Sequence, residues 1–341
     1  MAGASGTERA PALRARTGRR SRRRAWAELL RLPALFGVPG DALAGTAAAG
    51  ARPGARTLLA IGSSLCLYEA GMALNDWADR DVDAVERPHR PLPSGRIRPA
   101  AALTAACAFT AAGLALAARA GRPALTVAAP LAATVWAYDL GLKHTPAGPV
   151  AMGAARGLDL LLGAAASTGR PGPALPSAAL LGTHTVAVTT VSRHEAQGGA
   201  PLAPLAALAT TALLTRLVTR APAAGTGRHP SARPATGRPP ADALGAAGPR
   251  SVRGAAGRPS AATLLTTAGA AAYAAATARP YVHAALNPSP PLTQRAVGAG
   301  IRATIPLQAA LTARARGTAG ALLIAALAPL GAKFAKKVSV T

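Results

Sequence analysis

Acidic and aromatic side chains are both scarce in this chain. Its 341 residues include 13 Asp and Glu against 38 Lys and Arg, and only 3% of them are aromatic. Aromatic side chains supply the surfaces on which single-stranded nucleic acids stack, so their scarcity argues against such a ligand. The basic residues also fall between apolar blocks instead of along one face. We therefore expect no nucleic-acid partner, in spite of the formal net charge of +25.

Cysteine is nearly absent as well. The two cysteines, Cys66 and Cys107, form no CxxC motif and no paired spacing. A disulfide framework or a cysteine-based metal site would need such spacing to be inferred from sequence. We expect both side chains to be small buried hydrophobic groups within helices.

Charge of either sign is sparse, at 15% of residues, whereas half of the residues are apolar and the mean hydropathy is +0.25. Blocks of about 17 to 25 residues with few charges recur along the chain, and a helix of that length crosses a hydrocarbon core of roughly 30 Å. The pattern predicts an all-α, polytopic membrane protein. Because Ala is only weakly hydrophobic, an Ala-rich soluble helical bundle is the alternative.

Seven membrane spans are predicted in the first two thirds of the chain. Their approximate ranges are 27–49, 56–74, 100–118, 123–140, 147–167, 175–191 and 201–219. An eighth span is expected at 261–278. Two later apolar stretches, 296–312 and 318–332, give a total of about nine spans, or ten if both cross.

Two segments lie outside this pattern. The Arg-dense residues 1–26 predict a disordered cytoplasmic arm rather than a cleaved signal peptide. Residues 220–260 are rich in Pro, Gly and Arg and predict a disordered insertion.

The positive-inside rule orients the chain. With the Arg-rich start in the cytoplasm, the loops at 75–99, 141–146 and 192–200 share its side. They hold most of the polar residues. We therefore expect a multi-pass protein of the cell membrane, in contact with membrane lipids, whose site opens on the cytoplasmic side.

Five of the 13 acidic residues fall in one short stretch, NDWADRDVDAVERPHRPLPSGRI, residues 75–97. Asp76, Asp79 and Asp83 are three and four residues apart, so on a helix they share a face, with Asn75 one turn before Asp79. Carboxylates so close repel one another unless a cation lies among them. Mg²⁺ prefers such oxygen ligands and often binds substrate phosphates as well. The stretch predicts a Mg²⁺ site for a diphosphate ligand, formed by Asn75, Asp76, Asp79 and Asp83.

Basic residues follow within the same stretch. Arg87, Arg90 and Arg96 supply donors for phosphate oxygens, and the sequence RPLPSGRI predicts a turn that folds back over the site. The alternative is a solvated loop in which the Asp and Arg side chains simply pair with each other.

The pattern NDxxDxxxD, followed by ERPHRPLPSGRI, resembles the first aspartate-rich motif of the UbiA superfamily of intramembrane prenyltransferases. Residues 138–163, YDLGLKHTPAGPVAMGAARGLDLLLG, look like the family's fourth and fifth helices. The resemblance covers about residues 27–340, apart from the insertion. It implies a helical barrel of about nine spans. In that family, Mg²⁺ held by two Asp-rich motifs binds a prenyl diphosphate, and a lipophilic or aromatic acceptor attacks the resulting allylic carbocation.

The resemblance also implies roles for individual residues. Asp76, Asp79 and Asp83 would be the catalytic carboxylates that bind metal and diphosphate, together with Asn75. The cations that contact the diphosphate and stabilise its departing charge would be Arg87, Lys143 and Arg156.

The second motif departs from the family pattern. The stretch SRHEAQGG, residues 192–199, has one carboxylate, Glu195, where the family shows two or more. Glu195 would hold a second metal poorly, with Arg193 nearby, and His194 is either a ligand for a softer metal or a polar loop residue. This stretch, RATIPLQAAL at 302–311 and the closing KKVSVT resemble a divergent branch, the EboC-like proteins.

Further polar residues lie in or near the predicted spans, where a carboxylate is costly and often functional. Asp159 either contacts substrate or pairs with Arg156, three residues before it. Asp139, at the end of a span, is either solvated or functional. Glu69 is a candidate to line the cavity, and we expect His184 to be buried and hydrogen-bonded.

The leading hypothesis is a Mg²⁺-dependent membrane prenyltransferase that moves an isoprenyl group from a prenyl diphosphate to a lipophilic or aromatic acceptor. The second is a non-catalytic protein of the EboC type that binds a polyprenyl phosphate or lipophilic precursor for export, which the single carboxylate of the second motif favours. A transporter is a weaker third, because no inverted repeat or pair of broken helices is visible.

Overall fold

Helices make up the secondary structure of the described part of the chain, residues 22–220 and 259–339 of a computed structural model. The all-α prediction is therefore confirmed. Most of the predicted N-terminal arm and nearly all of the predicted insertion lie outside the described residues.

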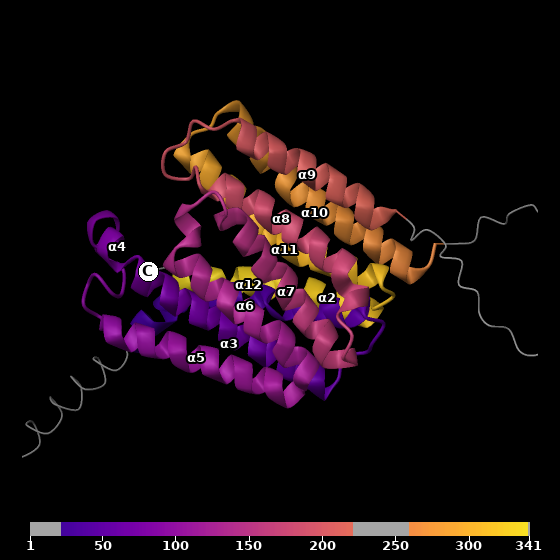
Figure 1. Ribbon diagram of the computed structural model, residues 1–341. Coiled ribbons are helices and arrows are strands. Elements are labelled where there is room, and N and C mark those ends of the chain that lie inside the picture. Colours follow the sequence, from indigo (N-terminus) through magenta and orange to yellow (C-terminus); the bar gives the residue numbers. More distant parts are fainter. Residues whose placement is uncertain (1–21, 221–258, 340–341) are drawn as a thin grey trace, which may run out of the picture.

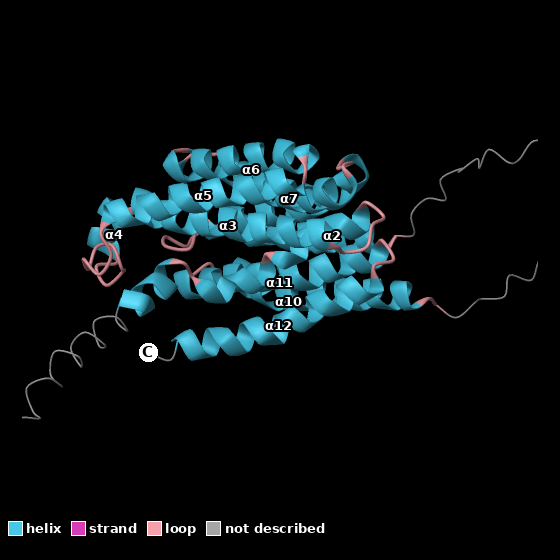
Figure 2. Cartoon of the chain, turned by 90° about the horizontal axis from the view of Figure 1, so that it is seen from below, coloured by secondary structure: helices cyan, strands magenta, loops and turns pink. Residues whose placement is uncertain are grey.

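The long helices run back and forth along one direction (Figures 1 and 2). They are α3 (Ala55–Ala78), α5 (Pro99–Ala120), α6 (Arg122–Leu140), α7 (Gly148–Thr168), α8 (Leu175–Ser192), α9 (Leu202–Thr219), α10 (Ala261–Leu286), α11 (Pro290–Arg314) and α12 (Thr318–Ser339). Helices α5 to α9 begin and end within two residues of the predicted spans. Both apolar stretches of the C-terminal region are helical, and α10 runs on to Leu286 instead of ending at 278.

Five of these helices have the length and apolar composition to cross a membrane. They are α3, α5, α7, α8 (counted from Gly172, with the short helix before it) and α9. Large apolar side chains point outward from several helices, including Leu58 at 69%, Val150 at 62% and Leu264 at 56% exposure. Such surfaces suit a lipid environment better than water, which disfavours the soluble bundle. The count of about nine spans stays a prediction.

The first predicted span, 27–49, is wrong as a single helix. A 3₁₀ helix, η1 (Leu32–Gly37), is followed by the short α2 (Pro39–Ala48). Arg31 has a positive φ of 47°, and prolines stand at the starts of both segments. Proline lacks the backbone donor that a continuous helix needs, so the chain breaks there.

Helix α2 is nevertheless central, because it packs against α3, α7, α11 and α12. Small residues allow this close approach. A Cβ added to Gly163 of α7 would collide with the backbone of Ala42, and one added to Gly45 of α2 would collide with the carbonyl of Leu160. Backbone contact of this kind lets helices associate through van der Waals packing where water is absent.

Outward-facing threonines donate hydrogen bonds from their hydroxyl groups to carbonyl groups of their own helix. Thr104, Thr134 and Thr210 donate to the carbonyl oxygen four residues earlier, at 2.7–2.8 Å. Such bonds leave no hydroxyl hydrogen unpaired on a surface that faces hydrocarbon.

One cysteine prediction is wrong. Cys66 is half-buried, but Cys107 lies exposed on α5. That helix packs along one side only and is among the least buried of the candidate spans.

Candidate active site

The acidic stretch continues α3 into the short helix α4 (Arg80–Glu86), with Asp79 at the joint. Helical hydrogen bonds run through the joint, from Asp79 N to Asn75 O at 2.9 Å and from Asp83 N to Asp79 O at 2.8 Å. Asp76 and Asp83 are 5% and 2% exposed, whereas the Asp81 side chain is 82% exposed. Asp76 and Asp83 therefore share an inward-turned face, and the side chain of Asp79, at the joint between them, is 23% exposed.

Each inward carboxylate lies against cations. Arg90 Nη1 is 2.6 Å from Asp83 Oδ2 and 3.7 Å from Asp76 Oδ1, so one guanidinium contacts both side chains. Arg31 Nη2 reaches Asp76 at 3.3 Å, and Arg87 Nη1 lies 3.6 Å from Asp83. The ion pairing of the alternative interpretation is present, but around buried carboxylates and not in a solvated loop.

The loop that follows α4 folds back toward the start of the chain, as its Pro and Gly residues predict. Arg96 forms a two-pronged ion pair with Glu28, at 2.7 and 3.1 Å, and also donates to the carbonyl of His89 at 2.5 Å. Arg96 therefore fastens this loop, and Arg87 and Arg90 are the arginines that lie nearest the carboxylates.

The connection between α6 and α7 meets the same site. It contains the one-turn helix η2 (Leu142–His144). Lys143 Nζ lies 2.5 Å from Asp79 Oδ1, and its side chain is only 8% exposed. Asn75 Nδ2 donates to Asp139 Oδ1 at 3.1 Å, which places Asp139 at the site instead of in solvent. The first motif and the 138–143 stretch are thus neighbours in space.

The α8–α9 connection joins from the other side. Arg193 donates to the carbonyl of Thr145 in the α6–α7 connection. Gly199 N donates to Pro288 O at 2.8 Å, between α10 and α11. All three predicted polar loops therefore lie at one end of the helices, the end that carries α4 in Figure 1.

Glu195 is half-buried in this connection. Burial raises the pKa of its carboxyl above the ordinary value, and the charge of Arg87 offsets part of the rise. The second motif thus lies close enough to the first for electrostatic contact. It contributes one carboxylate, as the sequence predicts.

A second polar cluster lies deeper between α2, α7 and α11. Arg156 Nη1 pairs with Asp41 Oδ2 at 2.9 Å, and Gln308 Nε2 donates to Asp41 Oδ1 at 2.7 Å. Asp159 accepts from Ser64 and not from Arg156, so the alternative of an intrahelical pair is wrong. Sequence analysis missed Asp41 and Gln308 as site residues, although a carboxylate inside an apolar span is itself a signal.

Two other polar residues take the predicted places. His184 is 2% exposed, with Nδ1 3.0 Å from the Tyr273 hydroxyl and Nε2 3.1 Å from Gly300 O. Glu69 is 6% exposed, and neither carboxyl oxygen has a hydrogen-bond partner within the described part of the chain. His184 is therefore a structural residue, whereas Glu69 points into the interior with its hydrogen-bonding capacity unused.

The side chains at this site have the oxygen donors that a divalent cation prefers. Asp76 and Asp83 converge on one Arg90 guanidinium, so a cation placed among them would contact oxygen donors of the kind Mg²⁺ prefers. Across residues 22–220 and 259–339, no three His, Cys, Asp or Glu side chains form a complete metal site by themselves. The Lys and Arg side chains around the carboxylates suit an anionic ligand.

Comparison with known proteins agrees with this arrangement. Residues 33–225 match the UbiA prenyltransferase family, which is more than half of the chain. The digeranylgeranylglyceryl phosphate synthase of Methanopyrus kandleri is 37% identical over 158 residues, which cover 45% of this chain and 56% of that enzyme. The chain thus spans about half the length of the curated relatives it matches.

Two solved structures share the fold. The apo structure of a UbiA homolog from Aeropyrum pernix K1 has a TM-score of 0.56 and 20% identity, and covers 80% of this chain and 96% of that one. A structure of a digeranylgeranylglyceryl phosphate synthase has a TM-score of 0.55 and 16% identity, and covers 87% and 98%. At these identities the likeness establishes the helical architecture alone.

Proposed function

Since this chain belongs to the UbiA prenyltransferase family, we propose that it is a Mg²⁺-dependent membrane enzyme that transfers a prenyl group from a prenyl diphosphate to a lipophilic acceptor. Membership and the apolar helices make it a multi-pass membrane protein. The observation that carries the proposal is the convergence of three buried or half-buried carboxylates and four cations at one end of the helices.

The site can bind a diphosphate by exchanging its ion pairs. Arg87, Arg90 and Lys143 now pair with carboxylates and are the donors nearest to an entering phosphate group. Mg²⁺ held by Asp76, Asp79 and Asp83, with the Asn75 side-chain oxygen as a further donor, would supply positive charge to the bound diphosphate. We propose that an entering diphosphate would pair with these cations, which would leave the carboxylates free to hold Mg²⁺.

Cleavage then depends on stabilising the leaving group. The bond between prenyl C1 and the bridging oxygen breaks, and its electron pair leaves with the diphosphate. A bond forms between C1 and the acceptor, which releases its proton to water. Lys143 and the two arginines stabilise the charge that develops on the diphosphate, an effect worth about 10²–10³ in rate for one well-placed donor. Arg156, Asp159 and Glu195 are proposed contacts of the bound substrates.

The named relatives suggest which class of acceptor to test first. A glyceryl phosphate lipid is the natural first acceptor to test, since the Methanopyrus kandleri relative is named for a product of that class. An aromatic acceptor is the second class. We further propose that the site opens on the cytoplasmic side, which the Arg-rich start of the chain supports.

The second candidate function is a non-catalytic carrier of the EboC type. The observation that favours it is the single carboxylate, Glu195, in the second motif. The relatives reported above are not of that type, so the carrier is the alternative outcome of the test.

The experiment is diphosphate release by the purified full chain in lipid vesicles, measured with a panel of prenyl diphosphates, both acceptor classes, and with or without Mg²⁺. Asp83→Asn is compared with Asp81→Asn, a matched change on the outward face of the same helix. We expect Mg²⁺-dependent release that Asp83→Asn abolishes and Asp81→Asn retains. Mg²⁺-dependent binding without release with every acceptor would establish the carrier instead.

A further inference from the structure

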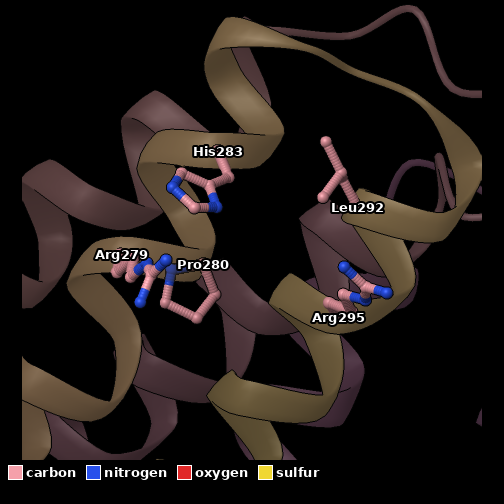
Figure 3. Close-up of a pocket in the computed structure, with 5 residues that line it drawn as sticks. All are labelled: Arg279, Pro280, His283, Leu292 and Arg295. Carbon is pink, nitrogen blue, oxygen red and sulfur yellow. The ribbon is translucent and has the colours of Figure 1, made fainter.

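A pocket of about 250 Å³ opens between α10 and α11 (Figure 3). Arg279, Pro280 and His283 of α10 form one wall, and Leu292 and Arg295 of α11 form the other. Two arginines and a histidine therefore face one small space. The proposed prenyltransferase reaction uses none of them.

The cations of this pocket have no counterion among residues 22–220 and 259–339. Arg279, His283 and Arg295 form no hydrogen bond or ion pair with any described residue. Helices α9 to α12 contain no Asp or Glu, and after Glu195 the sequence has a single carboxylate, Asp242, outside the described residues. These three side chains are exposed and are therefore available to an anionic ligand from outside the described chain.

The pocket lies near the C-terminal end of α10. Helix α10 has 26 residues. At 1.5 Å per residue it is about 39 Å long, which exceeds a hydrocarbon core of roughly 30 Å. A helix of this length that crosses the core extends beyond it at its ends, and Arg279 lies seven residues, about 10 Å, before the last helical residue, Leu286. A long Arg side chain can extend its charge toward that region while its stem stays in apolar surroundings.

Two exposed apolar side chains of α10 are close in sequence to the residues that line the pocket. Val282 and Leu286, on either side of His283 in the sequence, are 37% and 81% exposed. An anionic phospholipid has a phosphate that can pair with the cations and acyl chains that can contact the exposed apolar side chains. The pocket lies toward the same end of the molecule as the acidic stretch. The α8–α9 connection lies at that end, and its Gly199 N donates a hydrogen bond to Pro288 O in the turn between α10 and α11.

We propose that this pocket binds the phosphate of an anionic phospholipid from the surrounding membrane. Arg279 and Arg295 donate to the phosphate oxygens from opposite walls, His283 adds a ring nitrogen, and the acyl chains lie along the apolar outer surface of α10. No carboxylate is present to hold Mg²⁺. The pocket is therefore suited to a single phosphate group without a metal.

The experiment is native mass spectrometry of the full chain purified in detergent and titrated with phosphatidylglycerol or with zwitterionic phosphatidylcholine. The variants are Arg279→Gln, Arg295→Gln and the double change, and the matched control is Arg216→Gln, an exposed arginine near the far end of α9. One basic residue near an anionic lipid raises the affinity about fivefold. We therefore expect the affinity for phosphatidylglycerol to fall about fivefold in each single variant and about 25-fold in the double variant. Phosphatidylcholine retention and the Arg216→Gln control should stay unchanged.

Three results would overturn the proposal. One is undiminished phosphatidylglycerol retention by the double variant, with helical content by circular dichroism equal to wild type. Another is an equal loss in Arg216→Gln, which would indicate bulk charge attraction. The third is displacement of the lipid by millimolar inorganic phosphate, which would make the pocket a site for free phosphate.

Discussion

Lys143 and Asp79 form an ion pair, with 2.5 Å between Nζ and Oδ1, that joins the α6–α7 connection to the end of α3. The lysine side chain is 8% exposed and the aspartate side chain 23%. This partly buried pair connects two motifs that are far apart in the sequence. The pair also keeps the Lys143 ammonium group beside the place where we propose that the diphosphate binds.

Replacing Lys143 by Met should therefore lower kcat/KM for the prenyl diphosphate by about 10²-fold or more, because a donor to the leaving group is lost. Steady-state diphosphate release measures the effect. His144→Asn is the matched control, since His144 is 74% exposed and lies 3.9 Å from the same carboxylate. Near-normal turnover in Lys143→Met would remove Lys143 from the proposed mechanism.

The Arg156–Asp41 pair distinguishes a structural from a substrate-binding role for Arg156. Arg156→Met leaves a buried carboxylate without its partner, which should cost about 3 kcal/mol of stability, seen as a lower Tm in detergent. Adding Asp41→Asn should restore most of that Tm. If Arg156 also binds substrate, the double variant will be stable but will show a raised KM for the prenyl diphosphate. Full activity in the stable double variant would contradict that role.

Close packing of α2 against α7 gives a prediction about stability alone. Gly163→Ala places a methyl group against the backbone of Ala42, which neither helix can avoid by changing a side-chain rotamer. Overpacking of this kind costs about 1–3 kcal/mol and should lower Tm by several degrees. Gly172→Ala is the control, because no atom lies within 4 Å of its added Cβ. Equal Tm values for the two variants would show that α2 and α7 are not in backbone contact.

Glu195 should make stability depend on pH. Burial raises the pKa of its carboxyl in the folded state, so the folded protein binds this proton more tightly than the unfolded chain does. Its contribution is fully present below the ordinary glutamate pKa, about 4.3, and is lost as pH rises through the raised value. Glu195→Gln should therefore gain Tm relative to wild type as the pH rises from acidic to neutral, because the variant has no carboxyl to ionise in the folded state.

The control for this comparison is Glu86→Gln, an exposed change on α4. Both variants are followed by thermal unfolding at several pH values. A Tm difference between Glu195→Gln and wild type that stays constant with pH would show that the carboxyl is as well solvated in the folded state as in the unfolded chain.

Much of the helical architecture could be predicted from the sequence, because apolar blocks of membrane length leave few other structures open to the chain. The spacing of Asp76 and Asp83 likewise predicted their shared face, since helical periodicity is a local property. The broken first span shows the limit of composition. Residues 27–49 are apolar enough for one helix, but the prolines and the strained Arg31 outweigh that tendency.

Contacts between distant segments could not be predicted in the same way. Nothing near Arg156 in the sequence indicates that its partner is Asp41, 115 residues earlier, instead of Asp159 on its own helix. That choice is made by the packing of α2 against α7, which depends on glycines in both helices. Gln308 joins the same cluster from α11 for the same reason, after a separation of 267 residues.

The self-satisfied threonines of the outer surface have a consequence for how the chain enters the membrane. A hydroxyl already bonded to its own helix adds little to the cost of insertion, so hydropathy scales overstate the polarity of helices such as α10. Even so, α10 and α11 fall short of the hydropathy of a span, and each packs more extensively against the other than against any other helix. We therefore expect α10 and α11 to enter the membrane together as a helical hairpin, in which each helix shields its neighbour from lipid.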